Sequence, residues 1–307
     1  MALQSPAAPP EQSGDGAGEH RSGGSGSPAE TSRPLALPQL SQAEREEVMR
    51  RTAISAVVVH ETVREEGERE LRRTPPALAW SGLAAGLSMG FSMMSMGLLR
   101  AYLPEAPWRP LVTSLGYSVG FLIVVLGRQQ LFTENTLTVI LPLLAHPNWR
   151  TALGVLRVWS IVLVANLLGA FVFATVVAHT PLFPPQVQQA LFHVSAESLR
   201  GGFGLTVLRA IFAGWLIALM VWLLPNAENT RLHIIIILTY LVSLGGFSHI
   251  IAGAVEVLYL VSLGALSWGG FFVRFLLPTL AGNIIGGASL VAAINFAQVA
   301  TESSGTA

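Results

Sequence analysis

Six long apolar segments constrain the fold of this 307-residue chain more than any other feature. Each is close to the ~20 residues that a helix needs to cross a membrane. They lie at about residues 78–99, 111–144, 153–178, 205–224, 232–263 and 271–296, and Pro278 predicts a kink in the last one. The pattern predicts an all-α polytopic membrane protein with six transmembrane helices.

The distribution of charge supports this class. Only 12% of the residues are charged, against about 25% in an average soluble domain. Twelve of the 18 acidic residues precede residue 71, so the apolar part is nearly uncharged. A net charge of zero argues against nucleic acid as a partner. The absence of cysteine excludes disulfides, iron–sulfur clusters and cysteine-ligated zinc.

These patterns divide the chain into three parts. Residues 1–43 are rich in Gly, Ser, Pro, Ala and Gln and contain no apolar leader segment, so we expect a disordered tail. Residues 44–74 carry many charges and are expected to form an amphipathic cytoplasmic helix. Residues 75–300 contain all six apolar segments and form the expected transmembrane domain.

The charged helix has its own start signal and apolar positions. Ser41 and Glu44 have the spacing of a capping box, in which each residue satisfies an amide of the other. Ile54, Val57 and Val58 share one helical face among charged residues. The segment is compatible with a helix on or near the membrane, or with a solvated helix that has no part in transport.

Arginines set the expected orientation of the chain. Cytoplasmic flanks of membrane helices carry an excess of positive charge. Four arginines lie just before the first apolar segment, at Arg64, Arg69, Arg72 and Arg73. We therefore expect a multi-pass protein whose N-terminus is cytoplasmic, and six spans bring the C-terminus back to the same side.

Two of the six segments are interrupted. The second is broken at residues 127–131, and the fifth is broken by Gly245 and Gly246, shortly before His249. Adjacent glycines loosen a helix, since each costs about 1 kcal/mol relative to alanine. Irregular backbone at membrane depth is tolerated only where protein buries it or where it lines a cavity. An ionisable residue there is a functional-site candidate, so we place His249 at the centre of a path for a small solute.

The two interrupted segments also indicate an internal repeat. Phe132 and Phe247 lie 115 residues apart, one beside each break. The following segments each carry Asn-x-x-Gly, beginning at Asn166 and Asn283, which lie 117 residues apart. Corresponding interrupted segments in two halves are typical of transporters. The spacing predicts three plus three spans, with the second half inverted in the membrane.

At this point the chain resembles the formate/nitrite transporter family. The resemblance covers about residues 79–298 and rests on the segments Leu131-Phe132-Thr133, Gly246-Phe247-x-His249-x-x-Ala252 and the two Asn-x-x-Gly elements. It implies an aquaporin-like fold, a homopentamer in a bacterial inner membrane, and one pore per protomer for small monovalent anions or their conjugate acids, such as formate or nitrite. It implies no enzymatic activity, cofactor or metal.

The resemblance also implies roles for individual residues. His249 matches the central pore histidine of the family, and Thr133 matches a residue at the pore constriction. Phenylalanines and leucines form two apolar gates around the histidine, which points to Leu131, Phe132 and Phe247. These residues are the expected substrate pore.

The sequence departs from the family pattern at several positions. Ser248 and Gly253 stand where family members commonly have Glu and Asn, and Gln130 replaces an acid. The usual cations of the external mouth are not evident, and Arg200 is a candidate substitute. Glu256, deep in the fifth segment, is outside the pattern; we expect it either to be satisfied at a helix or subunit contact or to take part in the pore.

The residues around the breaks suggest how an anion could cross. Half-helices beginning near Thr133 and His249 would direct free N–H groups and positive dipole ends at the midplane. Thr133 and Ser248 would add hydroxyl hydrogen bonds, and Asn166 and Asn283 would support the broken backbones. An apolar neck disfavours charge on both an imidazole and a weak acid. Our hypothesis is that His249 gives a proton to the anion or holds it as an ion pair, so that transport is proton-linked.

Other classes of protein fit less well. The chain lacks the His-Glu-x-x-His of a zinc protease, and the region Gly287-Ala288-Ser289 is only a fragment of a serine-hydrolase elbow. An aquaporin-like channel for a neutral solute would show the motif Asn-Pro-Ala at both breaks. Neither break contains this motif. A membrane scaffold that uses residues 1–73 remains an alternative.

Overall fold

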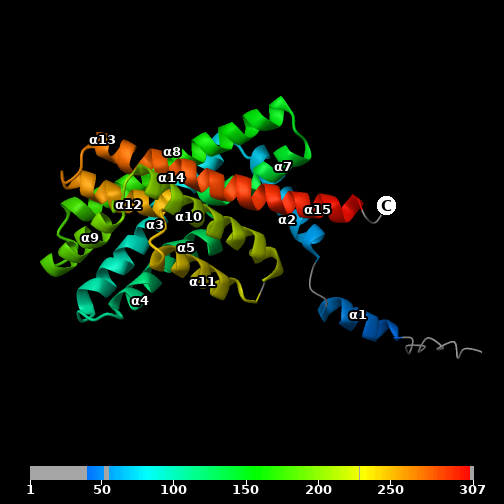
Figure 1. Cartoon of the computed structure of the whole chain (residues 1–307), viewed down its shortest axis with the longest axis horizontal. Coiled ribbons are helices and arrows are strands. Elements are labelled where there is room, and N and C mark those ends of the chain that lie inside the picture. Colours follow the sequence, from blue (N-terminus) through cyan, green and yellow to red (C-terminus); the bar gives the residue numbers. More distant parts are fainter. Residues whose placement is uncertain (1–39, 52–54, 228, 305–307) are drawn as a thin grey trace, which may run out of the picture. The chain divides into compact units, whose positions relative to one another are not determined.

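The computed structural model describes residues 40–51, 55–227 and 229–304, and these residues are helical almost throughout (Figure 1). The helices, including short 3₁₀ and π segments labelled η, are α1 Gln42–Arg51, α2 Ala56–Arg72, α3 Pro75–Tyr102, α4 Arg109–Thr113, η1 Ser114–Tyr117, α5 Ser118–Leu126, α6 Phe132–Thr138, α7 Ile140–Ala145, α8 Trp149–His179, α9 Pro185–Glu197, α10 Phe203–Leu223, η2 Leu224–Asn226, α11 Arg231–Leu244, α12 Ile250–Ser262, α13 Trp268–Gly270, η3 Phe271–Leu276, α14 Leu277–Ile284, η4 Ile285–Ala292 and α15 Ala293–Ser304.

The chain separates into two compact units, residues 1–51 and 52–307. In the first unit the structure describes α1, whose start confirms the expected capping box. The hydroxyl and backbone N–H of Ser41 both donate to Glu44 Oε2 at 2.8 Å, and the backbone N–H of Glu44 donates to Ser41 Oγ at 3.3 Å. The predicted disordered tail, residues 1–43, lies almost entirely outside the described residues.

The charged segment 44–74 forms two helices, α1 and α2, rather than one. Ser55 caps α2 by accepting a hydrogen bond from the backbone N–H of Val58. Val57 and Val58, two of the residues expected to share an apolar face, are exposed in this protomer, and the third, Ile54, lies outside the described residues. The buried face of α2 lies one position further along the helix, at Val59, His60, Val63 and Gly67.

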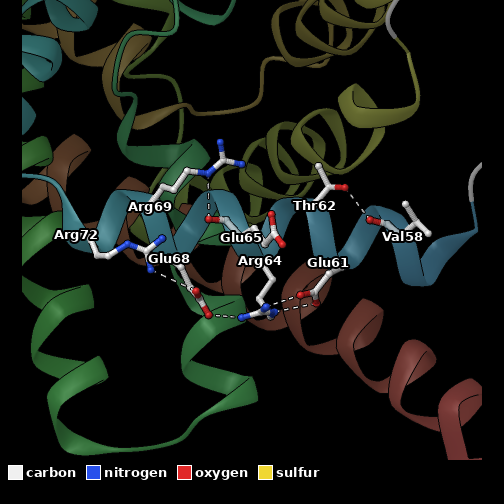
Figure 2. Close-up of polar contacts among 8 residues, drawn as sticks. All are labelled: Val58, Glu61, Thr62, Arg64, Glu65, Glu68, Arg69 and Arg72. Atoms are coloured by element: carbon white, nitrogen blue, oxygen red, sulfur yellow. Dashed lines mark hydrogen bonds and ion pairs between the residues drawn. The ribbon is translucent and has the colours of Figure 1, made fainter.

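Ion pairs within one helix cover the outer face of α2 (Figure 2). Arg64 bonds to Glu61 and to Glu68, and Arg72 Nη1 lies 3.4 Å from Glu68 Oε2. Exposed pairs of this kind are typically worth under about 1 kcal/mol each. They support the helix itself, whereas its buried face fixes where it packs.

Within the part of the chain that the structure describes, five helices are long and apolar enough to cross a membrane. They are Pro75–Tyr102, Arg109–Leu126, Trp149–His179, Phe203–Asn226 and Trp268–Val299. Three shorter apolar helices follow or flank the interruptions, at Phe132–Ala145, Arg231–Leu244 and Ile250–Ser262. The predicted second and fifth segments are thus each divided into two helices by a break, as the sequence indicates.

Small residues let the longest helices of the second unit pack closely. α3 packs against α8, and α10 packs against α14. A Cβ added to Gly86 would lie 2.1 Å from the carbonyl oxygen of Asn166, and one added to Gly214 would lie 2.4 Å from that of Asn283. Only glycine permits such backbone approach, which is common where membrane helices cross. The close crossings place the two asparagines beside the breaks.

The last apolar helix passes through Pro278 between two π segments, η3 and η4. Proline clashes with the carbonyl four residues earlier and removes one amide donor. The wider π turn before Pro278 accommodates both effects. A kink was expected at Pro278, and the helix there changes from a π-helical to an α-helical winding and back.

An apolar stripe faces outward along α8. Val164, Leu168, Val172 and Val176 repeat every four residues, and each is at least 43% exposed in this protomer. Residues at this spacing share one helix face. An uncovered apolar face of this length suits contact with lipid or with another membrane helix.

Candidate functional site

The first break begins with a tight turn at the end of α5. The backbone N–H of Gln129 donates to the carbonyl of Val124 at 2.9 Å, and that of Arg128 donates to Val125 at 3.2 Å. This pair of bonds is a Schellman motif, which satisfies carbonyls at a helix end. Arg128 supplies the left-handed residue of the motif, with φ of 50°, a conformation that usually requires glycine.

The second break begins with the same turn at the end of α11. The backbone N–H of Phe247 donates to the carbonyl of Val242 at 2.9 Å, and that of Gly246 donates to Ser243 at 3.0 Å. Here the left-handed position is Gly246, with φ of 61°. The two adjacent glycines noted in the sequence therefore end the helix in a defined turn.

Asn166 of α8 bridges the two sides of the first break. Its Oδ1 accepts a hydrogen bond from the backbone N–H of Phe132 at 2.9 Å. Its Nδ2 donates to the carbonyl of Gln130 at 2.8 Å and to the carbonyl of Gly82 at 2.7 Å. One buried amide thus satisfies backbone groups that the interruption of the helix leaves without partners.

Asn283 of α14 does the same at the second break. Its Oδ1 accepts from the backbone N–H of Ile250 at 2.8 Å, and its Nδ2 donates to the carbonyls of Ser248 at 2.9 Å and Ala210 at 2.8 Å. Both asparagines are fully buried. Their contacts are those that the sequence analysis expected of residues supporting the broken backbones.

The hydrogen bonds correct the register of the expected correspondence between the breaks. Phe132 and Ile250 each begin the second helix, so matching positions lie 118 residues apart, close to the spacing of the two asparagines. Phe132 therefore matches Ile250, and Phe247 matches Gln129. The pairing of Phe132 with Phe247 is wrong, since the two rings share a residue type without sharing a backbone position.

His249 is the N-cap of α12 and is 1% exposed. Its Nδ1 accepts hydrogen bonds from the backbone N–H groups of Ile251 and Ala252, both at 3.2 Å. Its Nε2 lies 2.8 Å from Thr133 Oγ1, and its ring meets Phe121 edge-on at 5.0 Å between centroids. The structure thus brings together the two residues, 116 positions apart, that the sequence places at the pore centre.

These contacts assign the proton on the neutral ring. Two N–H groups point at Nδ1, so Nδ1 is an acceptor and the proton lies on Nε2. Nε2–H then donates to Thr133 Oγ1. A doubly protonated ring would direct an N–H at the amide end of α12 and break both capping bonds.

The amide end of α12 has internal partners. Asn283 accepts the N–H of Ile250, and His249 accepts those of Ile251 and Ala252. The expectation of free N–H groups facing the midplane is therefore wrong for these three donors. The polar side-chain groups left at this point are the Nε2–H of His249 and the hydroxyl of Thr133, which bond to each other.

A cavity of about 120 Å³ reaches His249 from one side. Of the residues expected in the pore or its support, four line this cavity: Gly246, Phe247, Ser248 and His249. The other lining residues are Met96, Tyr117, Val194, Glu197, Ser198, Arg209, Ser243, Gly253, Glu256 and Phe275. The cavity thus combines an apolar wall with several hydroxyl and charged groups.

Leu131, Phe132 and Thr133 do not line this cavity. All three are essentially fully buried, and Phe132 meets Trp159 edge-on at 5.8 Å between centroids. Phe247 differs, because it is half-buried and stacks on Phe212 at 5.3 Å. The two phenylalanines therefore occupy different surroundings: one lies in packed protein and the other at the cavity wall.

Three charged residues of the cavity, Glu197, Arg209 and Glu256, were not assigned to the site from the sequence. Arg209 lines the cavity, whereas Arg200, the expected substitute cation, pairs with Glu197 at 3.5 Å. Glu256 also lines the cavity and accepts a hydrogen bond from Ser198 Oγ. The sequence shows that Glu256 is an acidic residue inside an apolar segment, which marks it as unusual. Only the fold shows that it lies on the side of α12 that faces the cavity.

Helix α2 packs against α6 and α7, the two helices that follow the first break. A Cβ at Gly67 would lie 1.9 Å from the carbonyl oxygen of Thr138, so α2 touches the end of α6 through its backbone. Glu70 pairs with Arg73 at 3.2 Å. Burial raises the pKa of Glu70, and the neighbouring Arg73 and Gln130 oppose that shift. Among the described residues, no group of three or more His, Cys, Asp or Glu could hold a metal ion.

Comparison with known proteins agrees with this geometry. The formate/nitrite transporter family model matches residues 57–297. The Escherichia coli (strain K12) inner membrane protein YfdC is 41% identical over 249 residues, covering 81% of this chain and 80% of that protein. The formate channel BtFdhC of Bacillus thuringiensis is 29% identical, covering 78% of this chain and 93% of that protein.

Solved structures show the same fold. A pentameric formate channel with formate bound matches with a TM-score of 0.63 at 20% identity, over 73% of this chain and 96% of that one. An ion channel of the FNT family matches with a TM-score of 0.67 at 18% identity, over 78% and 98%. The chain is therefore a member of the formate/nitrite transporter family, a family of membrane channels and transporters rather than enzymes.

Proposed function

We propose that this protein conducts small monovalent weak-acid anions such as formate or nitrite, and that they cross the narrowest point as the neutral acid. The observation that carries the proposal is the contact between His249 Nε2 and Thr133 Oγ1, which joins a residue that lines the cavity to one that is buried behind it. The formate channels among the relatives and solved structures support this substrate class.

The contact offers a hydrogen-bonding site for one small acid. A carboxylate or nitrite oxygen that reaches His249 can accept its Nε2–H in place of Thr133, and the threonine hydroxyl can then bond to the other oxygen. Ser248 lies in the cavity just before this point. Beyond it, Leu131 and Phe132 are buried, and Phe247 stands at the cavity wall. In the proposal these three form the apolar gates.

Proton linkage follows from the apolar surroundings. An unpaired charge in such a neck costs on the order of 3 kcal/mol on insertion scales. A weak acid avoids that cost by taking up a proton, whereas chloride does not. Because His249 holds its only proton on Nε2 and caps α12 with Nδ1, we assign it the role of hydrogen-bond donor to the acid. This modifies the sequence-based hypothesis, in which His249 itself gave up the proton.

We also propose the arrangement of the whole protein. α4 to α7 form one interrupted span and α11 with α12 form another, so that six spans cross the membrane. The matching turns and asparagine contacts support two inverted halves of three spans each. The arginines around α2 support a cytoplasmic N-terminus and C-terminus, with residues 1–43 a tail and 44–74 a charged cytoplasmic region.

Assembly and location belong to the same proposal. The pentameric formate channel supports a homopentamer with one pore per protomer, and the outward apolar face of α8 suits either lipid or a neighbouring protomer. The E. coli relative supports a bacterial inner membrane. Among proteins of this architecture, an apolar neck that contains a histidine favours a weak acid over other neutral solutes.

Uptake by proteoliposomes tests the function. We expect the wild-type protein to take up formate and nitrite faster at acidic than at neutral pH, and to exclude chloride. Replacing the neck donor in His249→Ala should lower formate uptake by severalfold, up to about tenfold, since a hydrogen bond between neutral groups is worth about 0.5–1.5 kcal/mol. Thr133→Val keeps the side-chain shape and should cost less.

Thr175→Val is a matched control, because Thr175 Oγ1 bonds to Ser262 away from the cavity. This variant should keep the wild-type rate and pH profile. An unchanged pH profile and substrate range in His249→Ala would contradict the proposed role of the histidine. Equal uptake of glycerol and formate by the wild type would instead indicate a channel for neutral solutes.

A further inference from the structure

Three residues on one face of α12 line the cavity. His249, Gly253 and Glu256 are spaced at i, i+4 and i+7, so they lie on one face, and all three line the cavity. Seven residues of α-helix rise ~10.5 Å, so Glu256 stands about two turns from the histidine. At Gly253 the absence of a side chain makes room for the ring of Phe275, since a Cβ there would lie 2.7 Å from its Cε2 and Cζ atoms. The carboxyl of Glu256 and the ring of His249 therefore line one cavity whose wall between them includes Gly253 and Phe275.

The carboxyl of Glu256 is hydrogen-bonded to a neutral hydroxyl group rather than paired with a cation. Glu256 is 5% exposed, and Ser198 Oγ donates a hydrogen bond to its Oε2. In the described part of the chain, no ion pair joins Glu256 to an arginine or histidine. Burial of an unpaired carboxylate is costly, whereas a protonated carboxyl carries no such cost. The surroundings therefore suit a group that holds a proton.

The cations near this carboxyl have other partners. Arg100 and Arg200 lie 3.1 Å and 3.5 Å from Glu197, and Arg209 donates to the carbonyl of Arg200 at 2.5 Å. The titratable and charged groups that face Glu256 or share its cavity are Glu197 of α9, Tyr117 of η1, Arg209 of α10 and His249 of α12, with Arg100 and Arg200 behind Glu197.

His249 alone cannot supply the proton that converts the anion into the neutral acid. Neutral His249 cannot release its Nε2 proton without first gaining one at Nδ1, which would break the cap of α12. A carboxylate at Glu256 would also repel an incoming anion. Both difficulties disappear if Glu256 is protonated when the anion arrives and ionised after it leaves.

We propose that Glu256 is the proton donor for the transported anion, an inference that rests on the proposed function. The O–H bond of the Glu256 carboxyl breaks, and an O–H bond forms on an oxygen of the bound anion. The neutral acid moves on to His249 and Thr133, and Glu256 remains as a carboxylate. Water at the mouth of the cavity then returns a proton to Glu256, so one proton crosses with each anion.

This role defines the substrate class. The anion must be the conjugate base of an acid weak enough to accept a proton from a carboxyl group, as formate and nitrite are. Nitrate and chloride do not qualify, although their size and charge are similar. Transport is electrically neutral, because the proton and the anion cross together.

The test uses the full chain in proteoliposomes, with formate as the probe and an inward proton gradient. Glu256→Gln keeps the shape and the Ser198 contact but cannot exchange a proton. We expect it to lose gradient-driven uptake by about tenfold or more. Any residual uptake should respond to an imposed membrane potential, whereas wild-type uptake should not. Glu105→Gln is the matched control, since Glu105 is highly exposed and lies outside the cavity.

The outcomes separate this inference from the proposed function. Wild-type vesicles that take up neither formate nor nitrite would overturn both. Active wild type with full gradient-driven, potential-insensitive uptake in Glu256→Gln would overturn the Glu256 inference alone. If Glu256→Gln does not assemble, Ser198→Ala removes only the neighbouring hydroxyl. That variant should shift the pH at which formate uptake is half-maximal, and an unchanged midpoint would overturn the inference.

Discussion

The two breaks have the same backbone and different side chains. Leu131 and His249 are the N-caps of α6 and α12, and their backbone angles agree within a degree, with φ of −101° and ψ of 131° and 132°. Each break follows a Schellman turn and each is bridged by one buried asparagine. Yet one cap is an apolar side chain and the other an imidazole. The backbone support and the chemistry of the site are thus separate properties of the fold.

The surroundings of the two breaks differ as well. α2 packs on α6, with Gly67 against the carbonyl of Thr138 at the C-terminal end of that helix, and Leu131, Phe132 and Thr133 at the first break are themselves buried. The second break opens instead on the cavity that contains Phe247, Ser248 and His249. A repeated backbone therefore yields one covered and one accessible site. The two breaks therefore differ in two ways: in the protein that covers them, and in the residue that caps the helix after each break.

Removing the bridging asparagines should have the largest effect. Asn166→Leu and Asn283→Leu each leave one buried N–H and two buried carbonyls without their side-chain partner. An unsatisfied buried group costs about 1–3 kcal/mol, so each variant should lose several kcal/mol and assemble poorly. Thermal unfolding in detergent measures the loss. If the two asparagines support their breaks in the same way, the two variants should lose similar amounts of stability.

Two further variants sharpen this result. The replacement of Asn283 by Asp keeps the acceptor for Ile250 but turns a carboxyl oxygen toward the carbonyls of Ser248 and Ala210. Because burial of an unpaired carboxylate is costly, this variant should be no more stable than Asn283→Leu. Asn148 caps the exposed start of α8, and Asn148→Leu should cost only about 1 kcal/mol. Buried-site losses no larger than that of Asn148→Leu would mean that the bridges contribute little.

Sequence patterns predicted the positions of the breaks but not their register. Interrupted apolar segments and repeated Asn-x-x-Gly elements are visible in the sequence because they depend on residue type. The matching positions depend on backbone hydrogen bonds, and Phe132 and Phe247 misled because like rings stand at unlike positions. The left-handed turn at Arg128 had no signal, since glycine normally marks such a position.

The site shows the same division. His249 was identifiable because an ionisable side chain inside an apolar segment is costly. Its contact with Thr133 remains a tertiary fact, as does the preference for Arg209 over Arg200 in the cavity. Likewise, the sequence could not reveal that His249 uses its own ring to cap α12. Residue type indicated which groups matter, and packing decided what each group contacts.

The two phenylalanines give a second, smaller comparison. Phe132 is 1% exposed, so Phe132→Ala should lower stability by about 3–5 kcal/mol. Phe247 is half-buried at the cavity wall, and Phe247→Ala should cost about 1–1.5 kcal/mol while raising the rate of formate uptake. Thermal unfolding and uptake, measured on the same preparations, separate packing from gating. Equal uptake in Phe247→Ala and wild type would exclude this ring as a gate.

The smallest effects should come from exchanging the turn residues. Arg128 and Gly246 hold the same left-handed position, at φ of 50° and 61°. A non-glycine residue there costs roughly 1–2 kcal/mol, and glycine loses more chain entropy on folding, by roughly 0.5–1 kcal/mol. Arg128→Gly should therefore stabilise the protein by a few tenths to about 1 kcal/mol.

The reverse change completes this comparison. No atom lies within 4 Å of a Cβ added at Gly246, so Gly246→Ala measures backbone strain without a steric clash. We expect a loss of about 1 kcal/mol, seen as a slightly lower midpoint of thermal unfolding. Opposite signs at Arg128 and Gly246 would show that both turns require the same backbone. Stabilisation in both variants would instead mean that the second turn relaxes away from its left-handed form, and the two breaks would then differ in backbone as well as in side chains.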